Sequence, residues 1–327
     1  MSGRVELLRL LADGAMHSGE ELAATLSISR AAVWKRLKQL EEWGIAIEAR
    51  RGSGYRLEAP IDLLDADRIC HALPQAAVER LRRLEVHETL ESTSDRLLSA
   101  SGLLPGRFDV CLAEFQSAGR GRRGRRWIAP FASGLCLSVS WNYRDAPATL
   151  GALSLAAGVA TLRALRRLRF TGLSLKWPND IMHAGGKLGG ILIDLRGEAA
   201  GPAYIVVGIG INVRLPASAR SVLRADGMDV VDLVSLGTPP SRSELAAVLI
   251  AELTQALLEF GGRGMAAFAE EWEGADALTG RQVAVLHGGQ ALEGVARGVD
   301  ADGALLLEVG GGRRRILSGE VSVRPVR

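Results

Sequence analysis

A segment rich in glycine and arginine, GRGRRG at residues 119–124, follows an apolar run and precedes Trp127. Glycine permits positive φ and close backbone approach, so consecutive N–H groups can converge on an anion. Arginine adds planar guanidinium donors that bind phosphate or carboxylate and stay charged. A flexible basic surface loop would share this composition. However, apolar strands, Trp127 and Pro130 bracket the segment, which favours a built anion site.

Two lysine motifs and one amide motif could serve the same chemistry. They are KWPND at residues 176–180, GGKLGG at 185–190 and GIGIN at 208–212. The proline of the first motif enforces a turn that should display the asparagine and aspartate after it. The third motif ends an apolar strand in an amide whose hydrogen bonds must be satisfied if it is buried. Either lysine alone would more often be solvated, so we expect a site only if the motifs lie together.

Residue spacing argues against several other chemistries. The chain contains no GxxxxGKS or GxxxxGKT phosphate loop, and valine at position 213 breaks the GxGxxG dinucleotide pattern. The three cysteines and five histidines are scattered without metal-ligand spacing, which fits a reducing compartment. No apolar run of ~18 residues and no signal-type N-terminus is present, so we expect a cytoplasmic protein with no membrane contact.

The elements that must position these motifs lie in the middle of the chain. At 327 residues, 47% of them hydrophobic, the chain can form two or three domains with sizeable cores. The pattern between residues 61 and 272 mixes strands and helices. We expect strands at 110–115, 134–141, 174–177, 187–195 and 204–213, helices at 94–101, 148–168 and 243–260, and a loop at 217–240.

The N-terminal 60 residues predict a winged helix-turn-helix. Ser18 has capping-box spacing to Glu21, and Ser29 can cap a second helix that runs to about Trp43. A hairpin with arginines at its tip follows at residues 45–57. In such a unit the second helix enters the major groove and wing cations meet phosphates. The candidate DNA contacts are Ser29, Arg30, Ala31, Lys35, Lys38, Arg50 and Arg51. The alternative is an interaction module with an ordinary solvated basic face.

The C-terminal part of the chain changes character. Short strand patterns separated by glycine-rich turns occur at 282–286, 292–299, 304–309, 314–317 and 321–323. Several short strands at this spacing predict a small β-barrel.

Together the motifs resemble the bifunctional biotin–protein ligases that also repress the biotin operon. The matching pieces include EST at 91–93, GRGRRG, KWPND, KLGG at 187–190, GIGIN and DGALLLE at 302–308. The resemblance covers nearly the whole chain in the family's order. It implies an α+β multidomain fold. The expected domains are a winged helix-turn-helix DNA-binding domain at 1–60, a class II aminoacyl-tRNA synthetase-like ligase domain with a mixed sheet at 61–274, and an SH3-like C-terminal β-barrel at 275–327.

The resemblance also assigns roles to residues. Lys187 and Arg122 would be the catalytic groups. Biotin would be held by Ser92, Thr93, Ser94, Gln116, Gly119, Arg120, Gly121, Arg122, Lys187 and Gly190. ATP would be held by Arg122, Lys176, Asn179, Asn212, Glu320 and Arg324, and no metal ligand is assigned. Ser94 departs from the family pattern, in which asparagine is usual. Residues 214–240 also contain no aromatic residue to cover adenine.

The implied activity has two steps. Biotin and ATP, with Mg²⁺, would give biotinyl-5′-AMP, and biotin would then pass to a lysine of the biotin carboxyl carrier protein of acetyl-CoA carboxylase. The adenylate would also act as corepressor by promoting a homodimer that binds operator DNA. Three alternatives stay open: a ligase with a vestigial DNA-binding domain, a lipoate-type ligase of related fold, and a transcription factor that only senses biotin.

Overall fold

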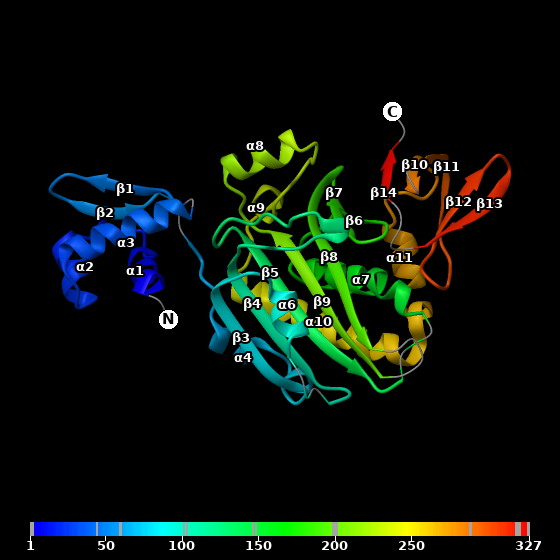
Figure 1. Cartoon of the computed structure of the whole chain (residues 1–327), viewed down its shortest axis with the longest axis horizontal. Coiled ribbons are helices and arrows are strands. Elements are labelled where there is room, and N and C mark those ends of the chain that lie inside the picture. The colour runs from blue at the N-terminus through cyan, green and yellow to red at the C-terminus, as the bar shows by residue number, and fades with distance from the viewer. Residues whose placement is uncertain are drawn as a thin grey trace.

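The chain forms three groups of elements along its long axis (Figure 1). The N-terminal helices and hairpin lie at one end, a large sheet with its helices lies in the middle, and a smaller sheet lies at the other end. The computed structural model describes residues 3–43, 45–58, 61–100, 102, 104–145, 147, 149–197, 202–287, 290–317 and 322–325.

The N-terminal group contains three helices, α1 (Gly3–Leu11), α2 (Gly19–Thr25) and α3 (Arg30–Glu42), and a hairpin of β1 (Ile47–Arg50) and β2 (Gly54–Leu57). Both predicted helix caps are confirmed. The Ser18 hydroxyl accepts a hydrogen bond from the Glu21 N–H at 3.0 Å, and the Ser29 hydroxyl accepts one from the Ala32 N–H at 3.2 Å. Leucine and valine side chains from all three helices form a core of their own. The order of helices and hairpin matches the predicted winged helix-turn-helix.

The central group is built on a seven-stranded mixed sheet in the order β3-β4-β5-β9-β8-β7-β6. The strands are β3 (Leu81–Leu90), β4 (Phe108–Gln116), β5 (Gly134–Tyr143), β6 (Leu173–Lys176), β7 (Asp180–His183), β8 (Gly186–Gly197) and β9 (Ala203–Asn212). β3 and β4 are parallel, and the other neighbours are antiparallel. The predicted mixed sheet is confirmed, although β3 and β7 were not among the expected strands.

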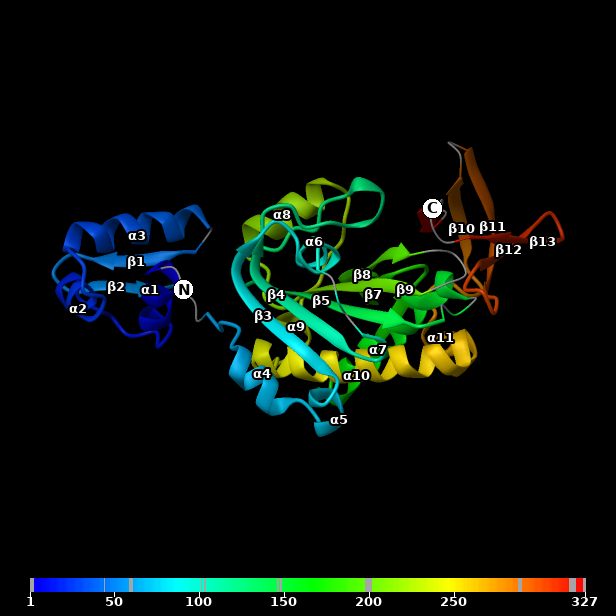
Figure 2. The same ribbon diagram turned by 60° about the horizontal axis from the view of Figure 1, so that its bottom comes forward.

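The helices of this group lie on both faces of the sheet and beyond one end of it (Figure 2). They are α4 (Ala66–Ala72), α5 (Gln75–Val78), α6 (Thr93–Leu98), α7 (Leu153–Arg167), α8 (Ala217–Ala225), α9 (Leu233–Leu236), α10 (Arg242–Arg263) and α11 (Ala269–Ala275). α7 and α10 pack on each other and on β8 and β5, while α6 lies against β4, β5 and β9 on the other face. This arrangement explains why β5 and β9 are almost continuously buried.

One helical stretch, Arg242–Ala267, has the length and apolar composition of a membrane-spanning helix. It packs on α7 and β5 in the main hydrophobic core, and packing there accounts for its composition.

The prediction of a loop at residues 217–240 was wrong. Pro216 precedes α8, on which Ala219 and Leu223 are buried, and Asp232 caps α9 by accepting a hydrogen bond from the Ser235 N–H. The helices were missed because they are short, nine and four residues, and bury only two side chains and one side chain, so each offers few repeats of a helical pattern.

The C-terminal group is a five-stranded antiparallel sheet in the order β13-β12-β11-β10-β14. Its strands are β10 (Gln282–His287), β11 (Gln290–Val299), β12 (Leu305–Val309), β13 (Gly312–Ile316) and β14 (Ser322–Pro325). The predicted strands are confirmed. The residues that the structure describes form an open sheet with β13 and β14 at its edges, so the SH3-like barrel is not confirmed.

A buried ion pair fastens the segment between the N-terminal and central groups. Arg242 Nη1 lies 2.5 Å from Glu114 Oε2, and the two side chains are 2% and 5% exposed. The second oxygen of Glu114 accepts a hydrogen bond from the Leu64 N–H at 2.6 Å. Arg242 also donates to the carbonyl oxygens of Asp62 and Gly134. The pair thus ties the connecting segment to the end of β4 and the start of α10.

An aromatic stack makes a second junction. The rings of Trp43, at the end of α3, and Phe131, just after the arginine loop, lie 4.6 Å apart with 12° between their planes. The Arg4 guanidinium lies 4.7 Å from the centre of the Trp43 ring. Phe131 therefore belongs to the N-terminal hydrophobic core although it is a residue of the central group.

Candidate active site

The start of α6 and the end of β4 form a buried cluster of hydroxyl and amide groups. Gln116 Oε1 accepts hydrogen bonds from the Thr93 N–H at 2.8 Å and from the Thr93 hydroxyl at 3.1 Å. Ser138 Oγ, from β5, lies 2.7 Å from Thr93 Oγ1 and 3.0 Å from Ser94 Oγ. Ser92 caps α6 and is also buried. Four of the predicted biotin residues therefore lie together, around a serine that sequence reasoning missed.

Trp127 lies against a surface formed by glycines of β8 and β9. A Cβ at Gly210 would lie 2.4 Å from the indole ring, and one at Gly190 would lie 3.7 Å from it. Glycine at position 210 is therefore what lets the ring come this close. The indole N–H is buried and has no hydrogen-bond acceptor among the described residues.

The arginine loop, residues 117–127, arches over a hollow of about 550 Å³ between itself and Leu192. Arg120 holds the loop down: its guanidinium donates to both carboxylate oxygens of Asp194 on β8, at 3.1 and 2.7 Å, and lies 2.8 Å from Asp95 on α6. Gly124 has a φ of 72°, a value that glycine adopts freely. The predicted anion loop is thus fixed by carboxylates from two other elements.

Lys187 lies at the start of β8, close to Gly190 and the Trp127 ring. We call the region formed by the Thr93–Gln116 cluster, the glycines beside Trp127 and Lys187 the ligand slot. Its Nζ is 2.5 Å from Asp180 Oδ1 and 6.0 Å from the centre of the Trp127 ring, and both members of the ion pair are about a quarter exposed. The buried Asn212 amide donates to the backbone oxygens of Lys187 and Val231, at 3.3 and 3.0 Å. Asn212 therefore braces the backbone that carries the lysine.

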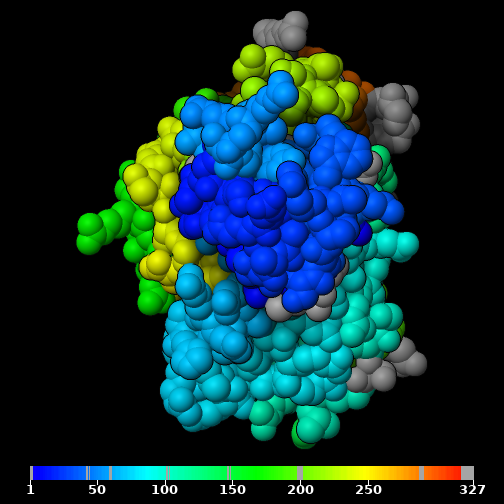
Figure 3. All heavy atoms as spheres, turned by 90° about the vertical axis from the view of Figure 1, so that its left-hand side faces the viewer, coloured from blue at the N-terminus to red at the C-terminus, as the bar shows by residue number. Residues whose placement is uncertain are grey.

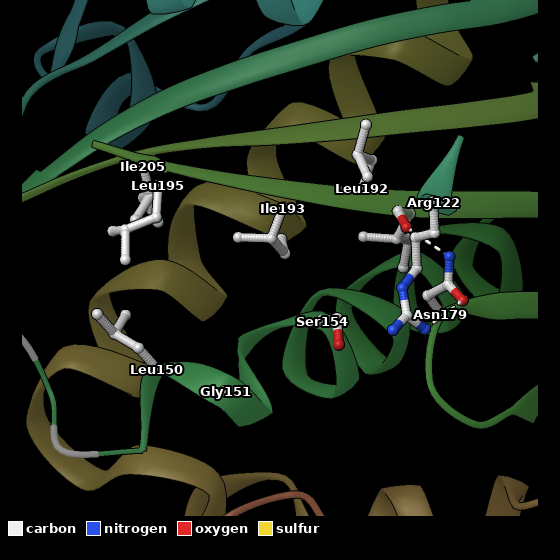
Figure 4. A pocket seen from close by; sticks show the side chains of 10 residues that line it. Arg122, Leu150, Gly151, Ser154, Asn179, Leu192, Ile193, Leu195 and Ile205 are labelled. Carbon is white, nitrogen blue, oxygen red and sulfur yellow. Dashed lines mark hydrogen bonds between the residues drawn. The ribbon is translucent and has the colours of Figure 1, made fainter. Parts of the chain in front are cut away.

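Arg122 and Asn179 meet at the mouth of a second cavity of about 240 Å³ (Figure 4). Arg122 Nη1 lies 3.4 Å from Asn179 Oδ1, and the Asn179 amide donates to the Ile191 carbonyl at 2.8 Å. Burial, followed by the nearby Arg123, lowers the pKa of the Arg122 guanidinium. The far end of the cavity is apolar and is lined by Leu150, Ile193, Leu195 and Ile205.

Three of the predicted nucleotide residues are located only through their backbone or lie outside the described residues. Lys176 ends β6 and pairs in register with Asp180 of β7. Glu320 lies outside the described residues. Arg324 is described only through its backbone, which pairs with Ala284 of β10.

Sequence reasoning missed the carboxylates that hold the cations. Asp180 stood inside the KWPND motif, and Asp194 interrupts the apolar strand β8. A single charge in an apolar strand is a signal that it faces a partner, because burying an unpaired charge is costly. The partner, Arg120, is 74 positions away and could not be chosen from sequence.

The predicted DNA contacts are all exposed, and the N-terminal group that carries them lies at one end of the molecule, toward the viewer in Figure 3. Arg30 pairs with Glu20 at 3.1 Å and Lys38 with Glu41 at 2.7 Å, and all four side chains are at least 45% exposed. Such surface pairs are worth about 0–1 kcal/mol, so phosphates can replace the carboxylates readily. The remaining contacts are Ser29, Ala31 and Lys35 on α3, and Arg50 and Arg51 at the hairpin tip.

Cations paired with carboxylates, next to a slot of hydroxyls, an amide and glycines, suit a small polar acid together with a phosphate group. Fold and site thus define a ligase that activates a carboxylic acid and that carries a DNA-binding unit.

Comparison with known proteins identifies the family. Residues 5–56 match a helix-turn-helix domain, residues 88–212 the biotin/lipoate A/B protein ligase family, and residues 278–324 the C-terminal domain of biotin protein ligases. The bifunctional ligase/repressor BirA of Escherichia coli (strain K12) is 39% identical over 98% of this chain and 97% of its own length. The biotin–[acetyl-CoA-carboxylase] ligase of Mycobacterium tuberculosis is 37% identical over 73% of this chain and 88% of its own.

A solved structure agrees with these matches. The biotin protein ligase from Aquifex aeolicus, in complex with biotin and ATP, is 27% identical with a TM-score of 0.62, over 75% of this chain and all of its own. The chain belongs to the biotin protein ligase family, and it is a biotin protein ligase with a helix-turn-helix DNA-binding domain.

Proposed function

We propose that the chain joins biotin to ATP, passes biotin to a carrier-protein lysine, and represses transcription when it holds biotinyl-5′-AMP. The observation that carries the proposal is the meeting of three features in one slot: the Thr93–Gln116 cluster, the glycine surface under Trp127, and Lys187. The biotin ring would bind the cluster through Ser92, Thr93, Ser94 and Gln116, its chain would cross Gly190, and its carboxylate would reach Lys187. The arginine loop, with Gly119, Arg120, Gly121 and Arg122, would close over it.

Adenylate formation needs charge neutralisation more than a side-chain nucleophile. A biotin carboxylate oxygen attacks the α-phosphorus, and the bond to the bridging oxygen breaks as pyrophosphate leaves. Lys187 would stabilise negative charge on the carboxylate and the α-phosphate by exchanging Asp180 for the ligand, since the 2.5 Å ion pair shows that its ammonium already binds an oxyanion. Arg122 would face the phosphates, beside Asn179 and the nucleotide contacts Lys176, Asn212, Glu320 and Arg324.

The ion pair of Asp180 also indicates how Mg²⁺ would be held in the slot. Asp180 is engaged by Lys187, so the site suits a cation held mainly by ATP phosphates with at most this one carboxylate, as is common for Mg²⁺. Bound there, Mg²⁺ would neutralise charge on the leaving pyrophosphate.

Transfer to the carrier completes the reaction. The amine of a lysine on the biotin carboxyl carrier protein of acetyl-CoA carboxylase attacks the acyl carbon of the adenylate, AMP leaves with the bridging oxygen, and the amine proton passes to water. The anhydride must survive until the carrier arrives. The arginine loop, fastened by Arg120 to Asp95 and Asp194, would keep water from it.

Dimerisation would use the open edge of β8. Beyond residue 190, β8 pairs with β9 on one side and with no described strand on the other. Leu195 on this stretch is 53% exposed. An unpaired strand edge with apolar side chains favours pairing with a second copy, which would set two winged units on a palindromic operator.

The use of ATP and DNA also leads us to infer a cytoplasmic location.

Biotinylation of a carrier domain tests the enzymatic proposal. The full chain is incubated with ATP, Mg²⁺, the biotin-carrier domain and either biotin or lipoate, and pyrophosphate release and carrier mass are measured. We expect the carrier to gain one biotinyl group, with pyrophosphate released only when biotin is present. Modification by lipoate alone, or none, would overturn the proposal.

Sedimentation tests the repressor proposal separately. We expect the chain to self-associate when biotin and ATP are both present and to dissociate without them. A sedimentation coefficient that stays the same in both conditions would remove ligand-promoted dimerisation.

A further inference from the structure

One aromatic side chain on the DNA-binding unit has no role in the fold. Trp34, on α3, is 57% exposed and is absent from the N-terminal core, whereas Trp43 on the same unit packs into it. The other five tryptophans of the chain are buried or half-buried. Single exposed apolar residues are common on proteins and carry little information. A tryptophan is different, because its large amphipathic ring is enriched where proteins bind partners.

The neighbours of Trp34 show which partner fits. On a helix, residues four apart lie one above the other, so Arg30, Trp34 and Lys38 form one stripe, with Lys35 beside it. All four side chains are exposed. Two of the three cations pair only with exposed carboxylates, and the Lys35 ammonium has no ion pair among the described residues. The indole of Trp34 thus lies between and beside positively charged side chains on the helix surface. A polyanion that also presents apolar groups fits such a surface.

Double-stranded DNA has this combination in its major groove. Phosphates line the rims, and on the floor each thymine exposes a 5-methyl group that apolar side chains contact. Trp34 lies in the second turn of α3, close to the N-terminal residues that a recognition helix points at base edges. No part of the central or C-terminal groups lies over this part of α3 in Figures 1 and 2.

We infer that Trp34 is a sequence-reading residue, whose indole contacts thymine 5-methyl groups in the major groove while Arg30, Lys35 and Lys38 bind the flanking phosphates. This inference rests on the proposed repressor function. It adds base specificity to an interface whose other contacts, predicted from sequence, are mainly cations for the backbone. Phosphate contacts position a protein on DNA, whereas base contacts decide which sequence it binds.

The test couples a protein change to a DNA change. The full chain with biotin, ATP and Mg²⁺ first selects its preferred site from a random-sequence duplex library. Fluorescence anisotropy then measures Kd for that duplex and for duplexes in which each thymine in turn is deoxyuridine, which lacks only the methyl group. The same series is measured with Trp34→Ala and, as a matched control, with Lys35→Ala.

We expect the wild-type chain to lose about four-fold in affinity at one thymine of each half-site, the effect of one methyl group. Trp34→Ala should bind thymine and deoxyuridine equally there and keep the wild-type salt dependence. Lys35→Ala should keep the methyl effect, bind all duplexes more weakly, and lower the slope of log K against log salt by about 0.9 for each half-site. The far-UV circular dichroism spectrum and the thermal unfolding of both variants should match wild type, which shows that they fold.

Two results would overturn the inference and can be told apart. If Trp34→Ala keeps the wild-type methyl effect at every thymine and selects the same site, the indole does not read thymine. If the wild-type chain selects no sequence, the repressor function fails and this inference fails with it.

Discussion

The chain has two surfaces built from cations, and they hold their charges in opposite ways. In the ligand slot, Arg120 and Lys187 are at most 36% exposed, and each contacts a carboxylate on another element of the same unit. On α3, Arg30 and Lys38 are more than half exposed and pair with carboxylates that are themselves exposed. The cations of the first surface are held in position by ion pairs within the central group, and those of the second are largely solvated.

This difference matches the two anions that we propose for the surfaces. A small acid and a phosphate must be held in one geometry for displacement at phosphorus, so preorganised donors lower the barrier. DNA is a long polyanion whose binding gains from released counterions, so solvated cations serve it well. Between the two surfaces lie the Trp43–Phe131 stack, which joins the end of α3 to the segment after the arginine loop, and the Glu114–Arg242 pair, which holds the connecting segment.

Substitution of Arg242 should have the largest effect on stability. Its ion pair with Glu114 holds the segment that connects the N-terminal and central groups. In Arg242→Met the Glu114 carboxylate would stay buried without its partner, which costs about 3–5 kcal/mol of unfolding free energy. Urea unfolding measures this. Arg263→Met, at the exposed other end of α10, is the matched control and should unfold like wild type. Adding Glu114→Gln should restore part of the loss, and an unchanged urea midpoint for Arg242→Met would contradict the assignment.

Lys187→Ala should have the next largest effect, and that effect should be confined to the chemistry in the ligand slot. Loss of a preorganised donor to a developing negative charge costs about 2–4 kcal/mol, so biotin-dependent pyrophosphate release should fall by about 30- to 900-fold. Lys35→Ala removes the same charge from the exposed surface and should leave this rate unchanged. Near-normal pyrophosphate release by Lys187→Ala would remove the lysine from the chemistry.

Salt concentration should distinguish the two surfaces through a smaller effect, on binding affinity. Raising the salt concentration from 50 to 200 mM weakens each exposed phosphate contact, so DNA affinity should fall steeply, with a slope of about 0.9 per contacted phosphate. Biotin binding in the part-buried slot should change little over the same range, since buried pairs are screened less. Isothermal titration with biotin and anisotropy with DNA give the two slopes. Equal slopes would show that the slot is as solvated as α3.

How far the sequence predicts these regions depends on the range of the interactions. Ser18 and Ser29 as helix caps, and the strands that carry the lysine and amide motifs, follow from local pattern, and the structure agrees. Partners far apart in the chain do not follow from pattern. Arg242 reaches Glu114 across 128 positions and Trp43 stacks on Phe131 only because the fold brings them together. The helices α8 and α9 were missed because they are too short to repeat a helical pattern, with two buried side chains on the first and one on the second.

The smallest expected effect is a pH-dependent contribution to stability from His17, which pairs with Tyr55 of the β1–β2 hairpin. A hydrogen bond from His17 to Asp13, with a weaker one to Glu21, raises the pKa of the His17 imidazole above its ordinary value of 6.5. A raised pKa stabilises the fold fully below about 6.5, and this contribution is lost as pH rises through the higher folded value. Asp13, whose pKa is lowered, stays ionised throughout. Thermal unfolding should therefore show wild type more stable than His17→Gln at pH 6, with the difference shrinking by pH 8.5. Glutamine keeps the backbone hydrogen bonds of His17 to Tyr55 of the hairpin, so a difference that stays constant with pH would contradict a contribution from the imidazolium charge.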